Sequence, residues 1–152
     1  MPALAEFVTT YGHLSFDHLP FDAPDSLTLT QIVYMPMEGL ADGVGETTVA
    51  QLWAHLQSNY PDSFTDPFQR KRYALTGLCA QAARYQDVRI RDYVNDVNPA
   101  QETQFCAATF LLPDGSRYIA FRGTDLTIAG WKEDLNMSFR TVPAQEKAVA
   151  YV

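Results

Sequence analysis

Two apolar stretches joined by a tight turn constrain the fold more than any other feature of this sequence. Residues 103–112 are rich in apolar and aromatic side chains, Pro113-Asp114-Gly115 follows, and residues 117–121 resume the apolar pattern. Asp-Gly readily takes the positive φ of a tight turn, so this spacing predicts a β-hairpin. Residues 88–97 alternate between apolar and polar positions, as a half-exposed strand does. We therefore predict an antiparallel meander of three strands.

Most of the chain before this meander has the periodicity of helices. Val49, Leu52, Trp53 and Leu56, for example, share one helical face. The expected helices cover residues 1–11, 25–34, 46–59 and 66–85, and further helices are expected around residues 131–135 and over 144–152. For the second of them, Asp25-Ser26 is the predicted cap, and the alternating Leu27 and Leu29 leave a strand open as an alternative.

Helices followed by antiparallel strands indicate a mixed α/β architecture in which helices pack on the meander. The chain has 152 residues, which is the size of a single domain. We expect that domain to be mostly helical over residues 1–86, to form the meander over 87–123, and to consist of loop and helices over 124–152.

The charge is unevenly divided along the chain. Residues 1–69 contain nine Asp and Glu and no Lys or Arg, whereas residues 70–152 contain eleven basic and nine acidic residues, and the net charge is −7. An acidic surface repels phosphate, so nucleic acid and anionic membranes are not expected as partners. The acidic half is more typical of a solvated face that aids solubility; docking on the more basic half, or on a basic partner, is the alternative.

The sequence gives several indications of the compartment. No apolar run approaches the roughly 18–20 residues that a transmembrane helix needs, and the N-terminus has no basic and apolar regions of a secretory signal. Cys79 and Cys106 form neither a CxxC motif nor a disulfide framework. We therefore predict a protein of the reducing cytoplasm.

Common catalytic and cofactor motifs are missing from the sequence. The histidines His13, His18 and His55 form no HExxH motif, so no metal is expected, and no glycine-rich loop precedes a Lys-Ser/Thr pair, so no cofactor is expected. No serine lies in Gly-x-Ser-x-Gly, and no paired carboxylates indicate hydrolysis by activated water. Cys79 and Cys106 lie among apolar residues and are more typical of core positions.

One segment has an unusual combination of residues. The apolar run Tyr118-Ile119-Ala120-Phe121 ends in Arg122-Gly123-Thr124-Asp125, and Gly130-Trp131-Lys132-Glu133-Asp134-Leu135-Asn136-Met137-Ser138-Phe139 follows. An isolated Arg-Gly-Thr is typical of a strand end with a capping threonine. Together with Tyr11-Gly12-His13-Leu14-Ser15-Phe16, however, these motifs resemble the DUF2974 family of bacterial, lipase-like α/β-hydrolases, which are related to class 3 lipases. The resemblance covers essentially the whole chain.

The resemblance implies a role for each residue of this segment. Thr124 would contribute to an oxyanion hole, where the loss of one donor costs about 3–4 kcal/mol of transition-state stabilisation. Arg122 would be structural, with Asp134 as the candidate partner of its guanidinium group. Gly123 would allow a close approach of the backbone, and Trp131 would anchor the helix that follows.

The same resemblance implies an incomplete enzyme. Family members continue into a nucleophile elbow and later Asp and His, whereas this sequence stops at Val152. The expectation is therefore the N-terminal portion of an α/β-hydrolase fold with an incomplete sheet. It would belong to a hydrolase of carboxylic esters or acyl lipids, inactive alone because the Ser-Asp-His triad is absent.

Two further expectations concern partners. The alternative to a hydrolase portion is a stand-alone binding module derived from a decayed hydrolase. The strand at residues 117–121 would also keep one edge open, and an open apolar edge is a template for strand pairing. The sequence therefore predicts a homodimer formed through this sheet edge, or a strand-swapped assembly.

Overall fold

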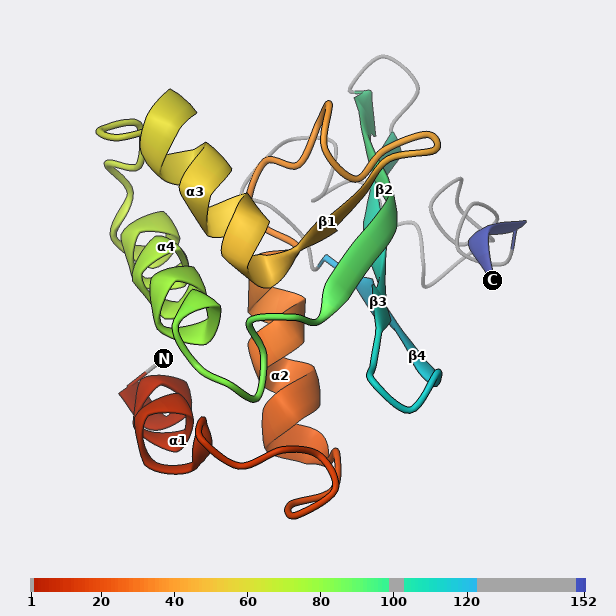
Figure 1. Ribbon diagram of the computed structural model, residues 1–152. Coiled ribbons are helices and arrows are strands. Elements are labelled where there is room, and N and C mark those ends of the chain that lie inside the picture. Colours follow the sequence, from red (N-terminus) through yellow and green to blue (C-terminus); the bar gives the residue numbers. More distant parts are fainter. Residues whose placement is uncertain (1, 99–102, 123–149) are drawn as a thin grey trace, which may run out of the picture.

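A computed structural model describes residues 2–98, 103–122 and 150–152 (Figure 1). Its helices and strands run in the order α1 (Pro2–Tyr11), α2 (Ala23–Ile32), β1 (Glu46–Thr48), α3 (Val49–Asn59), α4 (Pro67–Ala80), β2 (Arg89–Asn98), β3 (Thr103–Leu111) and β4 (Arg117–Phe121). The strands form one antiparallel sheet in the order β1-β2-β3-β4. The predicted mixture of helices and antiparallel meander is confirmed, with one strand more than expected.

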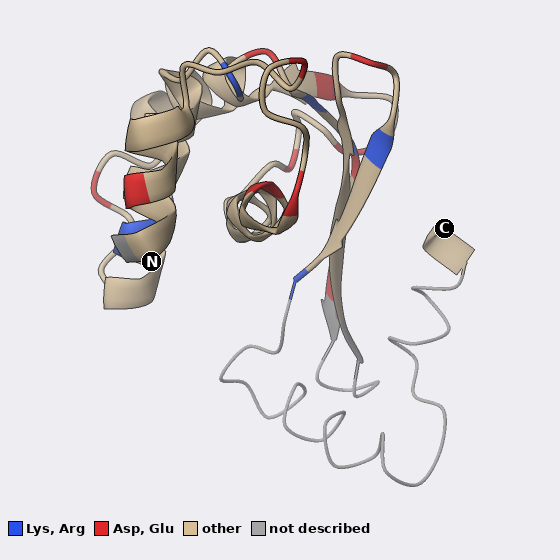
Figure 2. Cartoon of the chain, turned by 90° about the horizontal axis from the view of Figure 1, so that it is seen from below, with Lys and Arg blue, Asp and Glu red and all other residues tan. Residues whose placement is uncertain are grey.

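The helices cover one face of the sheet, which we call the inner face. Figure 2 shows the sheet nearly edge-on, with the helices on one side and the short C-terminal turn at residues 150–152 on the other. Helix α2 contacts both α4 and β4, and α3 contacts α4. The core fills the space between these layers, and its fully buried side chains include Leu29, Ile32, Leu52, Leu56, Ile90 and Phe110.

Local capping chemistry sets the ends of the helices. Helix α4 begins at Pro67 because the side chain of Asp66 accepts a hydrogen bond from the N–H of Phe68, as the sequence predicts. Helix α2 begins at Ala23, earlier than predicted, because Asp22 is its N-cap. Asp25 completes the capping box from the third helical position.

The segment predicted as a helix over residues 46–59 is divided between two elements. Glu46–Thr48 forms strand β1, in which Thr47 is opposite Ile90 of β2. Helix α3 begins only at Val49, because the hydroxyl of Thr48 caps the N–H of Gln51. β-Branched Thr47 and Thr48 suit the pleated sheet, and the apolar face of α3 starts only after them.

Helix α4 ends at Ala80, before the predicted end near residue 85. The N–H of Arg84 donates to the carbonyl of Gly12, at 2.8 Å, instead of continuing the helix. The chain turns here and holds the N-terminal arm, residues 12–22, against the rest of the molecule.

The expectation of an α/β-hydrolase fold gains no support from this architecture. All four strands of the described residues pair antiparallel with their neighbours. The described part of the chain establishes helices on an antiparallel sheet and nothing more specific. The helices predicted near residues 131–135 and over most of 144–152 lie outside it.

Candidate functional site

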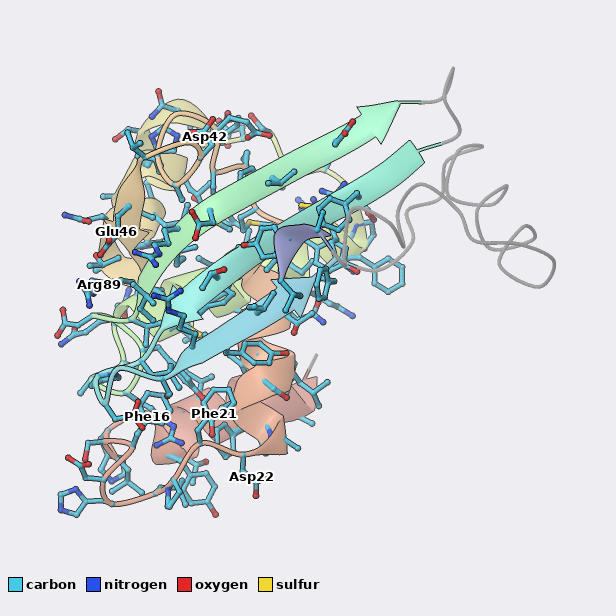
Figure 3. The ribbon with its side chains drawn as sticks, turned by 90° about the vertical axis from the view of Figure 1, so that its right-hand side faces the viewer. Phe16, Phe21, Asp22, Asp42, Glu46 and Arg89 are labelled. Atoms are coloured by element: carbon cyan, nitrogen blue, oxygen red, sulfur yellow. The ribbon has the colours of Figure 1, made fainter. Side chains whose placement is uncertain are left out.

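A pocket of about 420 Å³ lies on the outer face of the sheet, opposite the helices. Its lining residues come from the loop before β1, from the three long strands and from the C-terminal turn: Gly43, Asp92, Tyr93, Val94, Thr109, Arg117, Ile119, Tyr151 and Val152. Figure 3 looks onto this face, and the C-terminal turn lies in front of the strands. Pockets of this size are typical of small-molecule sites.

A β-bulge in β2 shapes the pocket. Arg91 is opposite Thr109 and Val94 is opposite Ala107, so two residues of β2 stand against a single residue of β3. Asp92, the first of the two, has φ +55°, which is the left-handed region that non-glycine residues rarely adopt. The bulge changes the phase of the alternation, so that Val94 lines the outer pocket.

Because of the bulge, the side chains of β2 do not alternate between the two faces as the sequence predicts. A regular strand would have placed Val88, Ile90, Asp92 and Val94 on one face. Instead Val88 and Ile90 are buried in the core, whereas Asp92 and Val94 are exposed on the other face. The one signal for this in the sequence is the acidic residue at a position where the pattern predicts an apolar one.

Tyr151 fixes the C-terminal turn to the bulge. Its hydroxyl donates to the backbone carbonyl of Asp92, at 2.8 Å, and lies 2.8 Å from the hydroxyl of Thr109. The tyrosine ring also packs edge-on against Phe105 and Phe121, with centroids 6.2 and 6.1 Å away. This contact explains why Phe105 and Thr109 are buried although they face away from the helices.

The strands of the outer face carry equal numbers of basic and acidic side chains: Arg89, Arg91 and Arg117 against Glu46, Asp92 and Asp96. Arg89 pairs with Glu46 at 3.1 Å (Figure 3), and Nε of Arg91 lies 3.4 Å from the carboxylate of Asp92. Arg117 is exposed at the pocket, and none of the ion pairs among the described residues includes it. The charged side chains that line the pocket are one of each sign, Asp92 and Arg117.

The register of β4 on β3 determines which backbone groups face the sheet. The N–H of Arg122 donates to the carbonyl of Cys106 at 2.8 Å, and the N–H of Leu112 donates to the carbonyl of Ser116 at 2.9 Å. Directly opposed residues of an antiparallel pair alternate between hydrogen-bonded and non-hydrogen-bonded. The even-numbered residues of β4 therefore direct their backbone groups to β3.

The odd-numbered residues of β4 direct theirs away from the sheet. Among the described residues, the N–H and C=O groups of Arg117, Ile119 and Phe121 have no backbone partner, because β4 is the last strand in the order. These groups form a row that matches the hydrogen-bonding pattern of a further strand. The predicted open edge at residues 117–121 is thus present in the part of the chain that the structure describes.

A buried ion pair holds the N-terminal arm. The guanidinium group of Arg84 binds both carboxylate oxygens of Asp25, at 2.7 and 2.8 Å, and lies 4.2 Å from the centroid of the Phe16 ring. The hydroxyl of Tyr85 donates to the same carboxylate at 2.6 Å. The side chains of Arg84 and Asp25 are 0% and 1% exposed, so the cluster is a structural lock.

The lock perturbs the pKa of each member. Burial alone would raise the pKa of Asp25, but hydrogen bonds from Arg84 and Tyr85 hold it below its usual value. Burial, together with the hydrogen bond to the Asp25 carboxylate, raises the pKa of Tyr85. These polar groups bind one another, so the cluster holds the N-terminal arm in place.

Most of the predicted site residues lie outside the described residues. This holds for Thr124, Gly123, Trp131 and Asp134, so the expected oxyanion hole and the Arg122–Asp134 pair stay predictions. Arg122 is described: its guanidinium group is 3.4 Å from Oδ1 of Asn95 and 5.8 Å from the centroid of the Tyr34 ring.

Metal binding, cysteine reactivity and membrane spanning were also assessed for the described part of the chain. None of its His, Cys, Asp and Glu residues form a group of three or more that could hold a metal ion. Both cysteines are buried in the core, and burial raises the pKa of the Cys79 thiol, which makes that thiol a poor nucleophile. None of the described helices is long and apolar enough to cross a lipid bilayer.

The comparison with protein families gives one result. The Mbeg1-like family model matches residues 79–152. This segment is just under half of the chain and contains the last two residues of α4, strands β2, β3 and β4, and the C-terminal turn with Tyr151. No curated protein matches the chain, and no solved structure matches it.

This similarity corrects the interpretation of the sequence. The matching family is Mbeg1-like and not DUF2974, so the resemblance to DUF2974 is wrong as an assignment. The lipase-like hydrolase function rested on that assignment and falls with it, and so does the description as a hydrolase or a truncated hydrolase. The alternative of a decayed hydrolase gains no specific support.

Proposed function

We propose that this chain is an assembly module, which pairs with a second copy of itself through the open edge of β4. The observation that supports the proposal is the row of outward N–H and C=O groups at Arg117, Ile119 and Phe121. Such a row favours the addition of an extended strand, because the added strand satisfies every unpaired backbone group.

The sequence of β4 suits antiparallel pairing with itself. A two-fold axis through the backbone at Ile119 places Ile119 of one copy opposite Ile119 of the other. The same axis places Arg117 opposite Phe121 at both ends of the pair. Each of these opposed residues exchanges two hydrogen bonds with its counterpart. The interface is isologous, which is the commonest symmetry of homodimers.

The side chains favour this register as well. On the outer face, the axis brings the guanidinium group of Arg117 beside the aromatic ring of Phe121, which is 39% exposed. A cation next to an aromatic ring contributes about 0.5–1 kcal/mol at an exposed site. The two Arg117 side chains stand at opposite ends, so no like charges are opposed across the pair.

The other edge of the sheet is a poorer template. Strand β1 has three residues, and the chain continues from it directly into helix α3. Its residue Glu46 is charged and pairs with Arg89. Short edges with charged side chains resist strand addition, so pairing through β4 is favoured.

Charge substitutions at residue 119 test the pairing and its register together. The variants Ile119→Lys and Ile119→Glu each place two like charges directly opposite across the axis, whereas a mixture of the two variants places a lysine opposite a glutamate. We expect sedimentation velocity at tens of micromolar to give a dimer for the wild type and monomers for each variant. The equimolar mixture is expected to give a dimer again.

A second pair of variants tests the backbone contribution. Ile119→Pro removes an outward N–H that does not bond β3, a substitution that edge strands tolerate, and Ile119→Ala removes the same side chain but keeps that N–H. We expect Ile119→Ala to remain dimeric and Ile119→Pro to be monomeric, with equal circular dichroism spectra. A monomeric wild type, or a mixture of the charged variants that stays monomeric, would overturn the proposal.

The predicted location in the reducing cytoplasm is part of the same proposal. Cys79 and Cys106 are both buried thiols of the core. Buried thiols of this kind suit a compartment in which glutathione keeps cysteines reduced.

A further inference from the structure

We infer that a second pocket, between helix α1 and the start of α2, binds a small organic amine through an apolar body and an ammonium group. This pocket has a volume of about 280 Å³. None of its lining residues lies on β4, so the site is independent of the proposed pairing of two copies.

The walls of this pocket select an apolar body. Most of the lining side chains are aromatic or aliphatic: Phe7, Leu19, Pro20, Phe21 and Pro24. Ligand sites usually have a volume of roughly 300–1,000 Å³ and predominantly apolar walls. The pocket lies at the small end of this range, so it accommodates one ring or a short aliphatic chain.

The walls are held in place without a ligand. The guanidinium group of Arg84 donates to the carbonyl of Pro20 at 3.4 Å, which ties the N-terminal arm to the structural lock. The ring of Phe21 packs against those of Phe16 and Tyr118, with centroids 5.9 and 5.4 Å away. A pre-formed site loses less conformational entropy on binding, which favours the binding of a small ligand.

The charge of the lining selects a cation. Asp22 and Asp25 are its charged residues. The guanidinium group of Arg84 compensates the charge of Asp25, whereas none of the ion pairs among the described residues includes Asp22, which is exposed. The net charge of the lining is therefore negative. The faces of the Phe7 and Phe21 rings add to this preference, because aromatic faces attract cations.

The surroundings of the pocket have the same sign of charge. Residues 1–69, which include the whole lining, contain nine Asp and Glu and no Lys or Arg. Glu6 of α1 and Asp17 of the N-terminal arm are exposed on the elements that form the walls. A cation is therefore attracted from solution, and an anion is repelled.

The first turn of α2 offers an anion no unpaired N–H group. The N–H of Ala23 donates to Oδ1 of Asp22 at 2.8 Å, and Pro24 has no N–H. The N–H groups of Asp25 and Ser26 both donate to the backbone carbonyl of Asp22, at 2.9 and 3.2 Å. The carboxylate of Asp22 still has lone pairs for a further donor, since a carboxylate accepts about four hydrogen bonds. An ammonium group supplies such a donor.

Three ligands that share a phenyl ring separate the contributions of charge and apolar contact. 2-Phenylethylamine is a cation at pH 7, 2-phenylethanol is its neutral analogue, and phenylacetate carries the opposite charge. We expect titration of the full chain, followed by ¹H–¹⁵N NMR at the amides of Leu19 and Phe21, to show saturable binding of the amine. Because an exposed ion pair is weak, 2-phenylethanol is expected to bind about two- to fivefold more weakly, and phenylacetate more weakly still.

Matched acidic variants locate the contact. Asp22→Asn keeps a side chain that caps helices well. It is expected to lower the affinity for the amine about two- to fivefold and to leave the affinity for 2-phenylethanol unchanged. Asp17→Asn removes an equal charge from the same arm but outside the lining, and at physiological salt it is expected to change neither affinity.

A variant of β4 separates this site from the pairing of two copies. Ile119→Glu, which is designed to prevent that pairing, is expected to bind the amine as tightly as the wild type does. Absence of saturable binding at 10 mM, binding of either analogue as tight as that of the amine, or equal effects of Asp22→Asn and Asp17→Asn would each overturn the inference.

Discussion

Replacing Arg84 tests the structural lock between the N-terminal arm and the rest of the molecule. In Arg84→Met the side chain keeps its approximate length and loses its charge and donors. The carboxylate of Asp25 loses the contacts at 2.7 and 2.8 Å, and the carbonyl of Leu14 loses a donor at 3.0 Å. Asp25, which is 1% exposed, is left with the hydroxyl of Tyr85 and a backbone N–H of Asp22.

The expected cost follows from this burial. Removing one partner of a buried ion pair costs about 3–5 kcal/mol, because the remaining charge has no compensation. The free energy of unfolding of a domain is about 5–15 kcal/mol in total. Arg84→Met is therefore expected to remove about a fifth or more of the stability, and to detach residues 12–22 from their present position.

Urea denaturation measures this cost, and Arg72→Met is the matched control. Arg72 lies on α4, is half-buried, binds the neutral side chains of Gln31 and Gln69, and stacks 3.7 Å from the centroid of the Tyr34 ring. Losing contacts of this kind costs about 1–2 kcal/mol. If Arg84→Met costs no more than Arg72→Met, the lock does not contribute as described.

Two further predictions concern stability. Because Arg84 and Tyr85 hold the pKa of Asp25 below its usual 3.8, its stabilising contribution is complete above about pH 4. That contribution to the free energy of unfolding is lost as the pH falls through the lowered pKa of Asp25. Urea midpoints measured from pH 6 to pH 2 are expected to show this loss of stability in the wild type and a smaller loss in Asp25→Asn. Gly77→Ala would place a Cβ 2.8 Å from the ring of Trp53, so calorimetry is expected to show a net destabilisation of about 1–2 kcal/mol. A stabilised variant would show that the ring moves aside.

Local signals in the sequence predict much of the fold. The turn at Asp114-Gly115 forms as expected: Gly115 has φ +87°, and the carboxylate of Asp114 accepts from the N–H of Ser116. Strand β4 has the predicted bounds, Arg117–Phe121. These features depend on short-range geometry, which neighbouring residues determine.

Long-range contacts account for what the sequence does not predict. The assignment of residues 46–48 to a helix fails because Thr47 finds its partner Ile90 only in the folded sheet. Nothing in the local pattern indicates that Arg84 meets Asp25, which is 59 positions away. The candidate site depends on the same kind of contact, since Tyr151 reaches Asp92 from the far end of the chain.

Amide hydrogen exchange at β4 tests the proposed assembly most directly, because it reads the edge one residue at a time. Tyr118 and Ala120 direct their N–H groups to β3, so both are expected to be protected at any protein concentration. Pairing of two copies predicts that Ile119 and Phe121, whose N–H groups face outward, exchange fast in dilute solution. As the concentration rises to tens of micromolar and above, they are expected to become protected. Fast exchange of Ile119 at every concentration would contradict the account.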